Sequence, residues 1–355
     1  MKIGILTFHC AYNYGAVLQT YALQEYLRQA GHEVSIINYR PNYLASLKPK
    51  ITLKQLITRH PLKLWWNLKT FPKRRKFFKT FSEFETHYIN IQSISTENQY
   101  DYIIIGSDQV WNKLYNGNDM IWYGNINKYY PKSKIITYAA SAGNATDNNI
   151  QPKTIYPYIS KLSAISVREE CLQQKLLNEA NIHSEVVLDP TLLISPSIWE
   201  RWKGPVIKGD YILVYQARED INVIRIAKNL AYTNKCQVIT IDFYPSSQSK
   251  GCKHYIASPI EFVRLIKYAK CVVTTSFHGT AFSIICQTPF YTIRLNDGAD
   301  DRSYKLLSSL NLKDRMIDKE SNNIELKNID FSKVKDLWIK LQKKSQQYLT
   351  NSLKI

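Results

Sequence analysis

The sequence has few cysteines and no long hydrophobic run. Its 6 cysteines are scattered over 355 residues, and no two form a CxxC pair. That spacing argues against a zinc site or a disulfide framework and favours a reducing compartment. No stretch approaches the roughly 18 apolar residues that a membrane-spanning helix needs. The opening residues, MKIGILTFHC, hold no apolar run long enough for a signal peptide, so we expect a cytoplasmic protein.

Acidic residues are scarce in one segment. The chain carries 47 Lys and Arg against 29 Asp and Glu, a net charge of +18, and the segment Lys48–Lys79 holds many of the cations and no acid. Nucleic acid, anionic lipid and phosphorylated small molecules are candidate partners for such a segment, and a solvated basic face is the structural alternative. Because tryptophans interrupt the cations, the segment suits a membrane interface as well as it suits nucleic acid.

Two series of alternating strand and helix patterns indicate two domains, as the length also does. A stretch rich in Pro, Gly and Lys, SPSIWERWKGPVIKGD, separates them. We predict a Rossmann-like domain over 1–195 with a basic helical insertion at about 44–90, a second Rossmann-like domain over 196–325, and a C-terminal helix over 326–355. This is an α/β, GT-B-like architecture, whose active site lies in the inter-domain cleft at the carboxyl ends of the strands.

The sharpest candidate site is the SFHG sequence at Ser276–Gly279, where a buried strand leads into a helix. A helix N-terminus there would favour an anion, and His278 could supply a proton. Ser276, Phe277 and Gly279 are the accompanying candidates for anion binding. The alternative is that His278 is a hydrogen-bonded polar residue at the end of a strand.

Two further strand ends carry charged residues. Arg168, in SVREE, is expected in the first turn of a helix, where a cation opposes the helix dipole and a ligand's negative charge would compensate it. A surface pair between Arg168 and a glutamate is the alternative. Asp189, in VLDPT, is a second candidate, although Asp before Pro also starts turns for structural reasons.

The loops that follow three strands of the first half are the remaining candidates. In two of them a glycine would let the backbone approach a ligand closely. None of them matches the dinucleotide GxGxxG or the P-loop. No cluster of metal-ligating residues is visible, and we expect neither a metal nor a cofactor. The candidate residues of these loops are Asn13, Tyr14, Gly15, Gly106, Ser107, Asp108 and Ser141.

Taken together, these segments resemble the polysaccharide pyruvyl transferase family. The resemblance runs from KIGILTFHCAYNYGAVLQTYALQ through DYIIIGSDQVWN, YAASAG, SVREE, VLDPTLL and SFHGTAFSIICQTPF to KLLSSLNLKDR. It implies a GT-B-like fold, phosphoenolpyruvate as the donor, and a glycan or glycan precursor as the acceptor. It also implies that His278 is the functional histidine, that Arg168 binds the donor, and that Asp189 is the Asp of the family's DP motif.

The sequence departs from the family pattern at two positions. Many members have Arg two residues before the histidine, where this chain has Ser276, which leaves Arg294, Arg302 or a lysine as the second cation for the donor. Many carry Asp in the first loop, where Ala16 stands. The acceptor therefore stays open and could be lipid-linked, nucleotide-linked or polymeric.

Two other functions remain as alternatives. A nucleotide-sugar glycosyltransferase of the same architecture usually has an acid that holds the ribose, and no Asp or Glu occurs between Glu261 and Asp297. A polyanion-binding protein acting through Lys48–Lys79 would not explain why several strand-end loops converge on one cleft. We therefore expect the basic segment to contact the inner face of the membrane or an anionic acceptor, and we do not expect a nucleic-acid partner.

Overall fold

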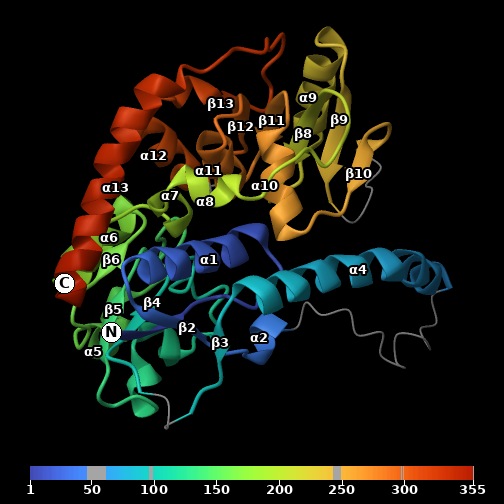
Figure 1. Cartoon of the computed structure of the whole chain (residues 1–355). Helices are drawn as coiled ribbons and strands as arrows, with labels where there is room; N and C mark the ends of the chain where they lie inside the picture. Colours follow the sequence, from blue (N-terminus) through green and yellow to red (C-terminus); the bar gives the residue numbers. More distant parts are fainter. Residues whose placement is uncertain (46–60, 96–98, 243–248, 297, 299, 355) are drawn as a thin grey trace.

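The structure is a computed structural model that describes residues 1–45, 61–95, 99–242, 249–296, 298 and 300–354. Two parallel β-sheets, each covered by helices, lie one above the other in Figure 1. The predicted boundary between 195 and 196 falls in the connection between these sheets, and as a domain boundary it stays a prediction.

The first sheet has the strand order β3-β2-β1-β4-β5, and every pairing in it is parallel. A small parallel pair, β6-β7, continues next to it through bridges from β5 and the residues that follow β5. The elements of this half are β1 (Lys2–Leu6), α1 (Tyr14–Gln29), β2 (Glu33–Ile37), α2 (Asn42–Ala45), α4 (Pro61–Tyr88), β3 (Ile91–Gln92), β4 (Tyr102–Ile105), η1 (Met120–Tyr123), η2 (Asn125–Lys128), β5 (Lys134–Thr137), α5 (Pro152–Ile159), β6 (Ser166–Val167), α6 (Glu170–Ala180), β7 (Glu185–Val186) and α7 (Pro190–Leu193).

The second sheet has the order β10-β9-β8-β11-β12-β13 and is also entirely parallel. Its first helix after the edge strand, α10, begins with a capping box, in which Ser258 and Glu261 cap each other's backbone. The elements of this half are α8 (Pro196–Glu200), β8 (Tyr211–Tyr215), α9 (Ile221–Thr233), β9 (Gln237–Ile241), β10 (Lys253–Tyr255), α10 (Pro259–Lys267), β11 (Cys271–Thr274), α11 (Phe277–Ile285), β12 (Phe290–Arg294), α12 (Asp301–Ser309), η4 (Lys313–Arg315), β13 (Met316–Asp318) and α13 (Phe331–Leu353).

Burial on both faces explains why the central strands are nearly continuous apolar runs. Every residue of β4, with the sequence YIII, and of β11, with the sequence CVVT, is buried. One core covers the outer face of each sheet, and a third and larger core fills the space between the sheets. The two halves of the chain are therefore held together by hydrophobic burial.

Helix α1 lies in this shared core (Figure 1) and joins the two halves through its aromatic residues. The ring of Tyr14 stacks on that of Phe262 with centroids 4.5 Å apart, and its hydroxyl donates to the carbonyl of Ala257 at 2.9 Å. About two turns further along, the ring centroid of Tyr21 lies 5.7 Å from that of Trp199 in α8. The N-terminus of α1 is thereby fixed against the second half.

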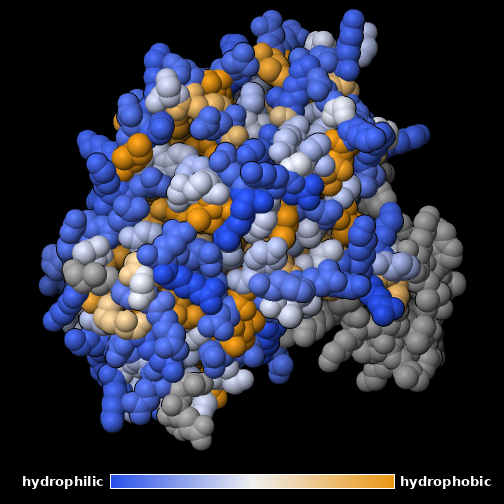
Figure 2. Space-filling model, viewed as in Figure 1, coloured by the Kyte–Doolittle hydropathy of each residue, from blue (hydrophilic) through white to orange (hydrophobic). Residues whose placement is uncertain are grey.

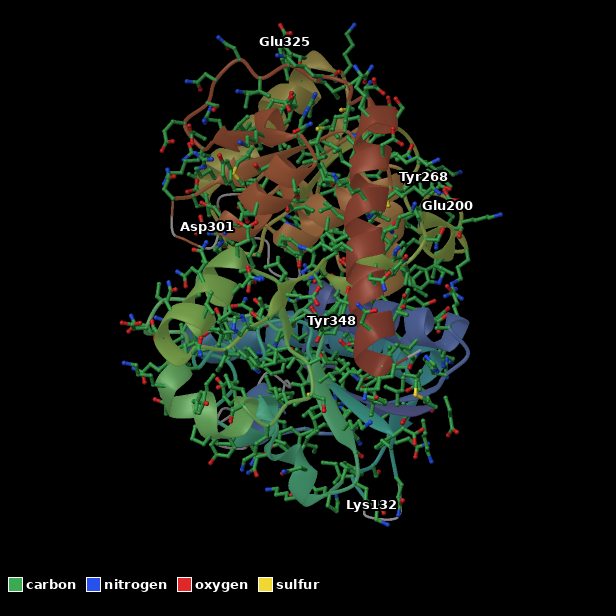
Figure 3. All side chains as sticks on the ribbon, turned by 90° about the vertical axis from the view of Figure 1, so that its left-hand side faces the viewer. Lys132, Glu200, Tyr268, Asp301, Glu325 and Tyr348 are labelled. Atoms are coloured by element: carbon green, nitrogen blue, oxygen red, sulfur yellow. The ribbon has the colours of Figure 1, made fainter. Side chains whose placement is uncertain are left out.

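The C-terminal helix α13 runs from the second half back to the first, as Figures 1 and 3 show. The indole of Trp338 donates to the carbonyl of Leu192, and the hydroxyl of Tyr348, at the other end of the helix, donates to the carbonyl of Thr137, both at 2.8 Å. The amphipathic pattern predicted this helix. The sequence did not predict that the helix would cross both halves.

The predicted basic insertion contains one long helix, α4, in the part that the structure describes. Phe77, Phe81 and Phe84 form its buried face and pack on Tyr14 and neighbouring residues of the first half. The apolar face predicted from Leu53 to Leu68 lies outside the described side chains. No helix in the described ranges is both long and apolar enough to cross a membrane.

Strand order predicts where a ligand should bind. In each sheet the order reverses once, between β1 and β4 in the first sheet and between β8 and β11 in the second. Loops at the carboxyl ends of strands on either side of such a reversal leave a crevice that ligands commonly occupy. The loops after β4 and β11 carry Ser107 and His278, which places both residues at predicted ligand-binding positions.

Candidate active site

His278 lies in the first turn of α11, directly after β11, as predicted. The side chain of Ser276 caps this helix and accepts the N–H of Gly279 at 3.4 Å. The imidazole packs against Gly15 of α1 so closely that a Cβ added at Gly15 would lie 2.0 Å from Nδ1. Any side chain at position 15 would therefore displace the ring of His278.

Asp189 occupies the centre of the candidate site and has two separate roles. Its Oδ1 accepts both the N–H and the hydroxyl of Thr191, at 2.9 and 2.7 Å, and so caps the short helix α7. Its Oδ2 lies 2.8 Å from a guanidinium nitrogen of Arg168 and 3.6 Å from Nε2 of His278. The predicted turn-starting role and the predicted functional role of Asp189 are therefore compatible.

The predicted position of Arg168 in a helix requires a correction. Glu169 is the N-cap of α6, so Arg168 precedes the helix and is not in its first turn. Its side chain is only 4% exposed and pairs with Asp189, which is fully buried. It also donates to the hydroxyl of Ser107. The alternative of a surface pair with a glutamate is therefore wrong, because the partner is a buried aspartate from another loop.

The Arg168 guanidinium still has hydrogen-bonding capacity to spare. Its Nε and Nη1 atoms are buried and have no hydrogen-bond partner. A second arginine, Arg302 in the first turn of α12, also has a buried Nε without a partner. The guanidinium carbons of Arg168 and Arg302 lie 5.4 and 5.8 Å from the centroid of the Phe277 ring. Two cations thus contact one aromatic ring and present unpaired donors.

The pKa shifts in this cluster follow from burial and from the neighbouring charges. Burial alone would raise the pKa of Asp189, but Arg168 and His278 outweigh it and hold that pKa below its usual range. Burial, together with repulsion from Arg168, lowers the pKa of Arg302. Arg302 therefore lies where a further negative charge would be stabilising.

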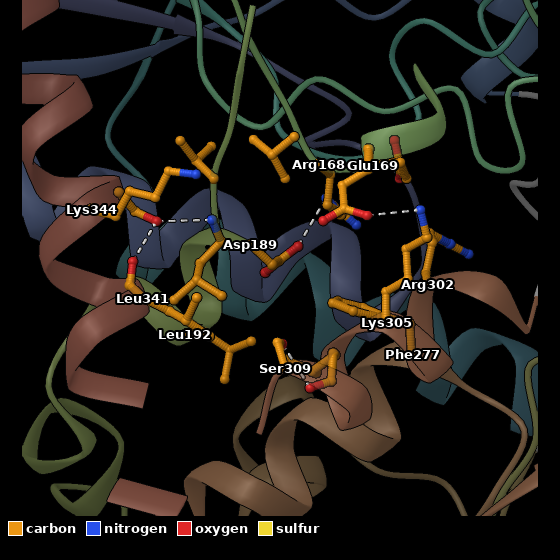
Figure 4. Close-up of a pocket in the computed structure, with 16 residues that line it drawn as sticks. Arg168, Glu169, Asp189, Leu192, Phe277, Arg302, Lys305, Ser309, Leu341 and Lys344 are labelled. Carbon is orange, nitrogen blue, oxygen red and sulfur yellow. Dashed lines mark hydrogen bonds and ion pairs between the residues drawn. The ribbon is translucent and has the colours of Figure 1, made fainter. Parts of the chain in front are cut away.

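Three residues of this cluster, Arg168, Asp189 and Arg302, line a cavity of about 180 Å³, shown in Figure 4. Arg168, Asp189, Phe277 and Arg302 form part of its wall, and α13 contributes Leu341 and Lys344 on the opposite side. His278 is not one of the lining residues. Its nearest link to the cavity is the carboxylate of Asp189, which does line it.

The candidate loops of the first half differ in how much they contribute to the candidate site. Asn13 caps α1 and is exposed, whereas Tyr14 is buried in the contact between the two halves. At Gly106 the backbone passes so close to Tyr138 that an added Cβ would lie 2.3 Å from its carbonyl oxygen. Asp108 accepts the N–H of Gln109. Among the residues of these loops, Ser107 contacts Arg168 and Gly15 contacts His278, and the charge of Asp108 acts on Arg302.

Two residues of the cavity had weaker signals in the sequence. Arg302 was one of three candidates for a second cation, and its position in the first turn of a helix is the unfavourable position that was expected of Arg168. Arg294, another candidate, is placed elsewhere, next to Asp318 and the ring of Tyr304. Glu169 has no signal in the sequence beyond that of an acid at a helix start. Its carboxylate accepts the hydroxyl of Ser141 and faces the cavity.

Comparison with known proteins decides the family. The model of the family described as polysaccharide pyruvyl transferase matches residues 13–297. The chain belongs to this family. It is therefore an enzyme of a transferase family, and the matched region contains Arg168, Asp189 and His278 but ends before Arg302. A search of curated protein sequences finds no match.

Solved structures confirm the GT-B-like α/β fold. The trehalose-6-phosphate synthase OtsA is 8% identical with a TM-score of 0.54, and the match covers 100% of this chain and 99% of that one. A putative UDP-N-acetylglucosamine 2-epimerase from Listeria monocytogenes is 10% identical with a TM-score of 0.50, and the match covers 99% and 91%. At such low identity the resemblance concerns the fold alone. Among the described residues, no three His, Cys, Asp or Glu side chains are grouped to hold a metal ion.

The close contact between Gly15 and His278 leads to a first prediction. Gly15→Ala should destabilise the protein by about 1–3 kcal/mol, the usual cost of overpacking, although alanine is the better helix former. In a His278→Ala background the added methyl has room, so the same change should be neutral or stabilising. Urea unfolding of the four proteins gives the coupling energy, and equal effects of Gly15→Ala in both backgrounds would show that the contact is absent.

The buried ion pair leads to a second prediction. Asp189→Asn leaves Arg168 without its counter-charge and should cost about 3–5 kcal/mol at neutral pH. Because the folded-state pKa of Asp189 is depressed, its stabilising contribution is complete above the unfolded value of about 3.9 and is lost only as pH falls below it. The stability difference between wild type and Asp189→Asn should stay constant from neutral to mildly acidic pH. A difference that shrinks already between pH 7 and pH 5 would contradict the depressed pKa.

Proposed function

We propose that this enzyme transfers the pyruvyl group of phosphoenolpyruvate to a sugar of a polysaccharide or its precursor, with release of phosphate. The observation that carries the proposal is the pair of guanidinium groups at the Phe277 ring. Arg168 and Arg302 together present three buried nitrogens without hydrogen-bond partners next to one cavity. Unpaired buried donors of this kind are costly unless a ligand satisfies them.

The chemistry of the donor matches this arrangement. Phosphoenolpyruvate carries a carboxylate and a phosphate on the same carbon, C2, of a small planar enol, and guanidinium groups bind both anions with charge-assisted hydrogen bonds. Arg168 is already neutralised by Asp189, so Arg302 is the cation with more charge to offer. We therefore infer that Arg302 replaces the arginine that many family members carry at the position of Ser276.

The proposed reaction balances without a metal or a cofactor. A proton adds to C3 of the enol, one acceptor hydroxyl attacks C2, and a second hydroxyl closes the ketal as the C2–O bond to phosphate breaks. The two hydroxyl protons of the acceptor account for the new methyl hydrogen and for the proton on the released phosphate. His278 is the proposed proton donor, since imidazole transfers protons near neutral pH.

The position of His278 suggests the side from which the acceptor approaches. Its ring lies between Asp189 and Gly15, so it adjoins the loop after β1 and not the interior of the cavity. The exposed N-cap residue Asn13 belongs to that loop. We propose that the donor occupies the cavity and that the sugar approaches past the loops that carry Asn13 and Ser107.

A third prediction tests the donor assignment. Phosphate release from phosphoenolpyruvate should be measured across lipid-linked, nucleotide-linked and polymeric acceptors. With an accepted substrate, Arg168→Lys and Arg302→Lys should each lose a charge-assisted hydrogen bond, about 1.5–3 kcal/mol, and so raise the apparent KM for the donor about 10- to 150-fold. His278→Ala should instead lower turnover about 10²–10⁴-fold.

The matched control is Arg294→Lys, since Arg294 ends β12 next to Asp318 and is not one of the residues that line the cavity. It should leave the KM for the donor unchanged. The donor assignment fails if Arg168→Lys and Arg302→Lys behave like this control. If a nucleotide sugar protects the protein against thermal unfolding and phosphoenolpyruvate does not, the glycosyltransferase alternative replaces the proposal.

The basic helix α4 supports a proposal about the acceptor. Lys73, Arg75 and Lys76 are exposed and Arg74 is half-buried, whereas the phenylalanines of the same helix pack inward. Hydrophobic residues on the face shown in Figure 2 are scattered and form no continuous patch. We therefore propose that charge, more than an apolar surface, draws this helix to an anionic membrane face or to an anionic lipid-linked acceptor.

A fourth prediction concerns this membrane contact. Each basic residue near an anionic surface contributes on the order of 1 kcal/mol, so a variant with Lys73, Arg74, Arg75 and Lys76 all changed to Gln should float poorly with anionic vesicles. Wild type should float with anionic and not with neutral vesicles, and less so as salt rises.

A variant with Lys333, Lys335, Lys340 and Lys343 changed to Gln is the matched control, because it removes four charges from the exposed face of α13. It should float like wild type. The membrane proposal is wrong if wild type stays in the soluble fraction at low salt, or if both variants lose binding equally.

A further inference from the structure

Among the described residues of the cavity wall, Glu169 is the acidic side chain that has a buried oxygen with neither a hydrogen bond nor an ion pair. The residue is 3% exposed. Its Oε1 accepts the hydroxyl of Ser141, whereas its Oε2 is buried and has no hydrogen-bond partner. Asp189 differs, because its unpaired oxygen lies in ion-pair contact with Arg168. Glu169 is thus a buried carboxyl group next to the proposed anion site.

Charged and polar groups from several elements surround Glu169. Arg168 precedes it in its own loop, and Arg302 acts on it from α12. Lys305 of α12 forms an ion pair at 3.4 Å with Glu170, the exposed residue that follows Glu169. On the remaining sides lie the thiol of Cys171 in α6, and the hydroxyl of Ser141 with the backbone after it. An ionised Glu169 is therefore a counter-charge to both arginines, and Asp108 and Asp189 also act on Arg302.

An incoming anion would change this balance. A phosphate or carboxylate at the unpaired Nε of Arg302 would bring a further negative charge close to Glu169, since both residues line the same cavity. Like charges in such a place raise the cost of ionising both groups. Burial also raises the pKa of Glu169, although both arginines, the Ser141 hydroxyl and the backbone N–H of Ala142 oppose this rise. A protonated carboxyl group would remove the repulsion and would itself become a donor.

We propose that Glu169 takes up a proton from solvent when the donor's phosphate or carboxylate enters the cavity, and that its Oε2–H then donates a hydrogen bond to that anion. No bond of the donor changes in this step. The pocket then offers the anion the guanidinium donors of Arg168 and Arg302 and one carboxylic acid. The identity of the anion rests on the proposed function, whereas the proton uptake rests on the cavity alone.

Sulfate is the probe that tests the proposal, because it is a dianion that carries no proton at neutral pH. Titration calorimetry of sulfate into the full chain between pH 6 and 8.5, in two buffers of different ionisation enthalpy, counts the protons bound. Wild type should take up close to one proton per sulfate, and its affinity should fall about tenfold per pH unit where uptake is complete. Glu169→Gln should take up none and bind sulfate with a pH-independent affinity, tighter than wild type at high pH.

Glu170→Gln is the matched control, since Glu170 is the next residue along and its carboxylate is 67% exposed. It should behave like wild type, as should His278→Gln if the proton resides on Glu169. Loss of proton uptake in His278→Gln with retention in Glu169→Gln overturns the proposal, as does sulfate binding to wild type without proton uptake. The proton count for wild type needs no variant, so this outcome can be measured even if Glu169→Gln fails to fold.

A parallel titration with phosphoenolpyruvate separates this proposal from the proposed function. Binding of both anions without proton uptake overturns the role of Glu169 and leaves the donor assignment standing. Sulfate binding with proton uptake, together with no binding of phosphoenolpyruvate, supports Glu169 and overturns the donor assignment. If neither anion binds, both are wrong.

Discussion

Arg168 and Asp189 form a buried ion pair on which the candidate site depends. The pair joins the loop after β6 to the start of α7, and its outer contacts reach Ser107 after β4 and His278 in α11. A buried pair of this kind adds little stability compared with well-packed apolar residues, because both charges lose their water. Retaining it makes sense if its unpaired guanidinium nitrogens have another partner. The site is thus arranged as a cation cluster that is incomplete without an anion.

Much of the fold was predictable because the local signals agree with the tertiary structure. Buried parallel strands gave continuous apolar runs, and the capping box at Ser258 marked the start of α10. The long-range arrangement of the helices was harder to predict from the sequence. Helix α1 is buried on nearly all sides because the first sheet and the second half both cover it, and Tyr14 contacts a residue 243 positions away. The path of α13 across both halves likewise depends on contacts that no local pattern encodes.

The site was predictable to a similar extent. Strand-end position selected Arg168, Asp189, Phe277 and His278, and the structure places the first three on one cavity and His278 in contact with Asp189. The sequence predicts Arg168 in the first turn of the helix, whereas Glu169 is the N-cap and Arg168 lies just before the helix. The unpaired Nε of Arg302 and the unpaired oxygen of Glu169 could not be predicted, since they follow from how α12 packs against the loop after β6.

A crystal structure with phosphoenolpyruvate bound would test the central claim most directly. The account predicts phosphate and carboxylate oxygens about 2.7–2.9 Å from Arg302 Nε and from Nε or Nη1 of Arg168, the usual length of a charge-assisted hydrogen bond. The enol should lie beside the Phe277 ring, with its C3 on the side of Asp189 and His278. An anion bound elsewhere along the crevice, with both arginines still unpaired, would contradict the account.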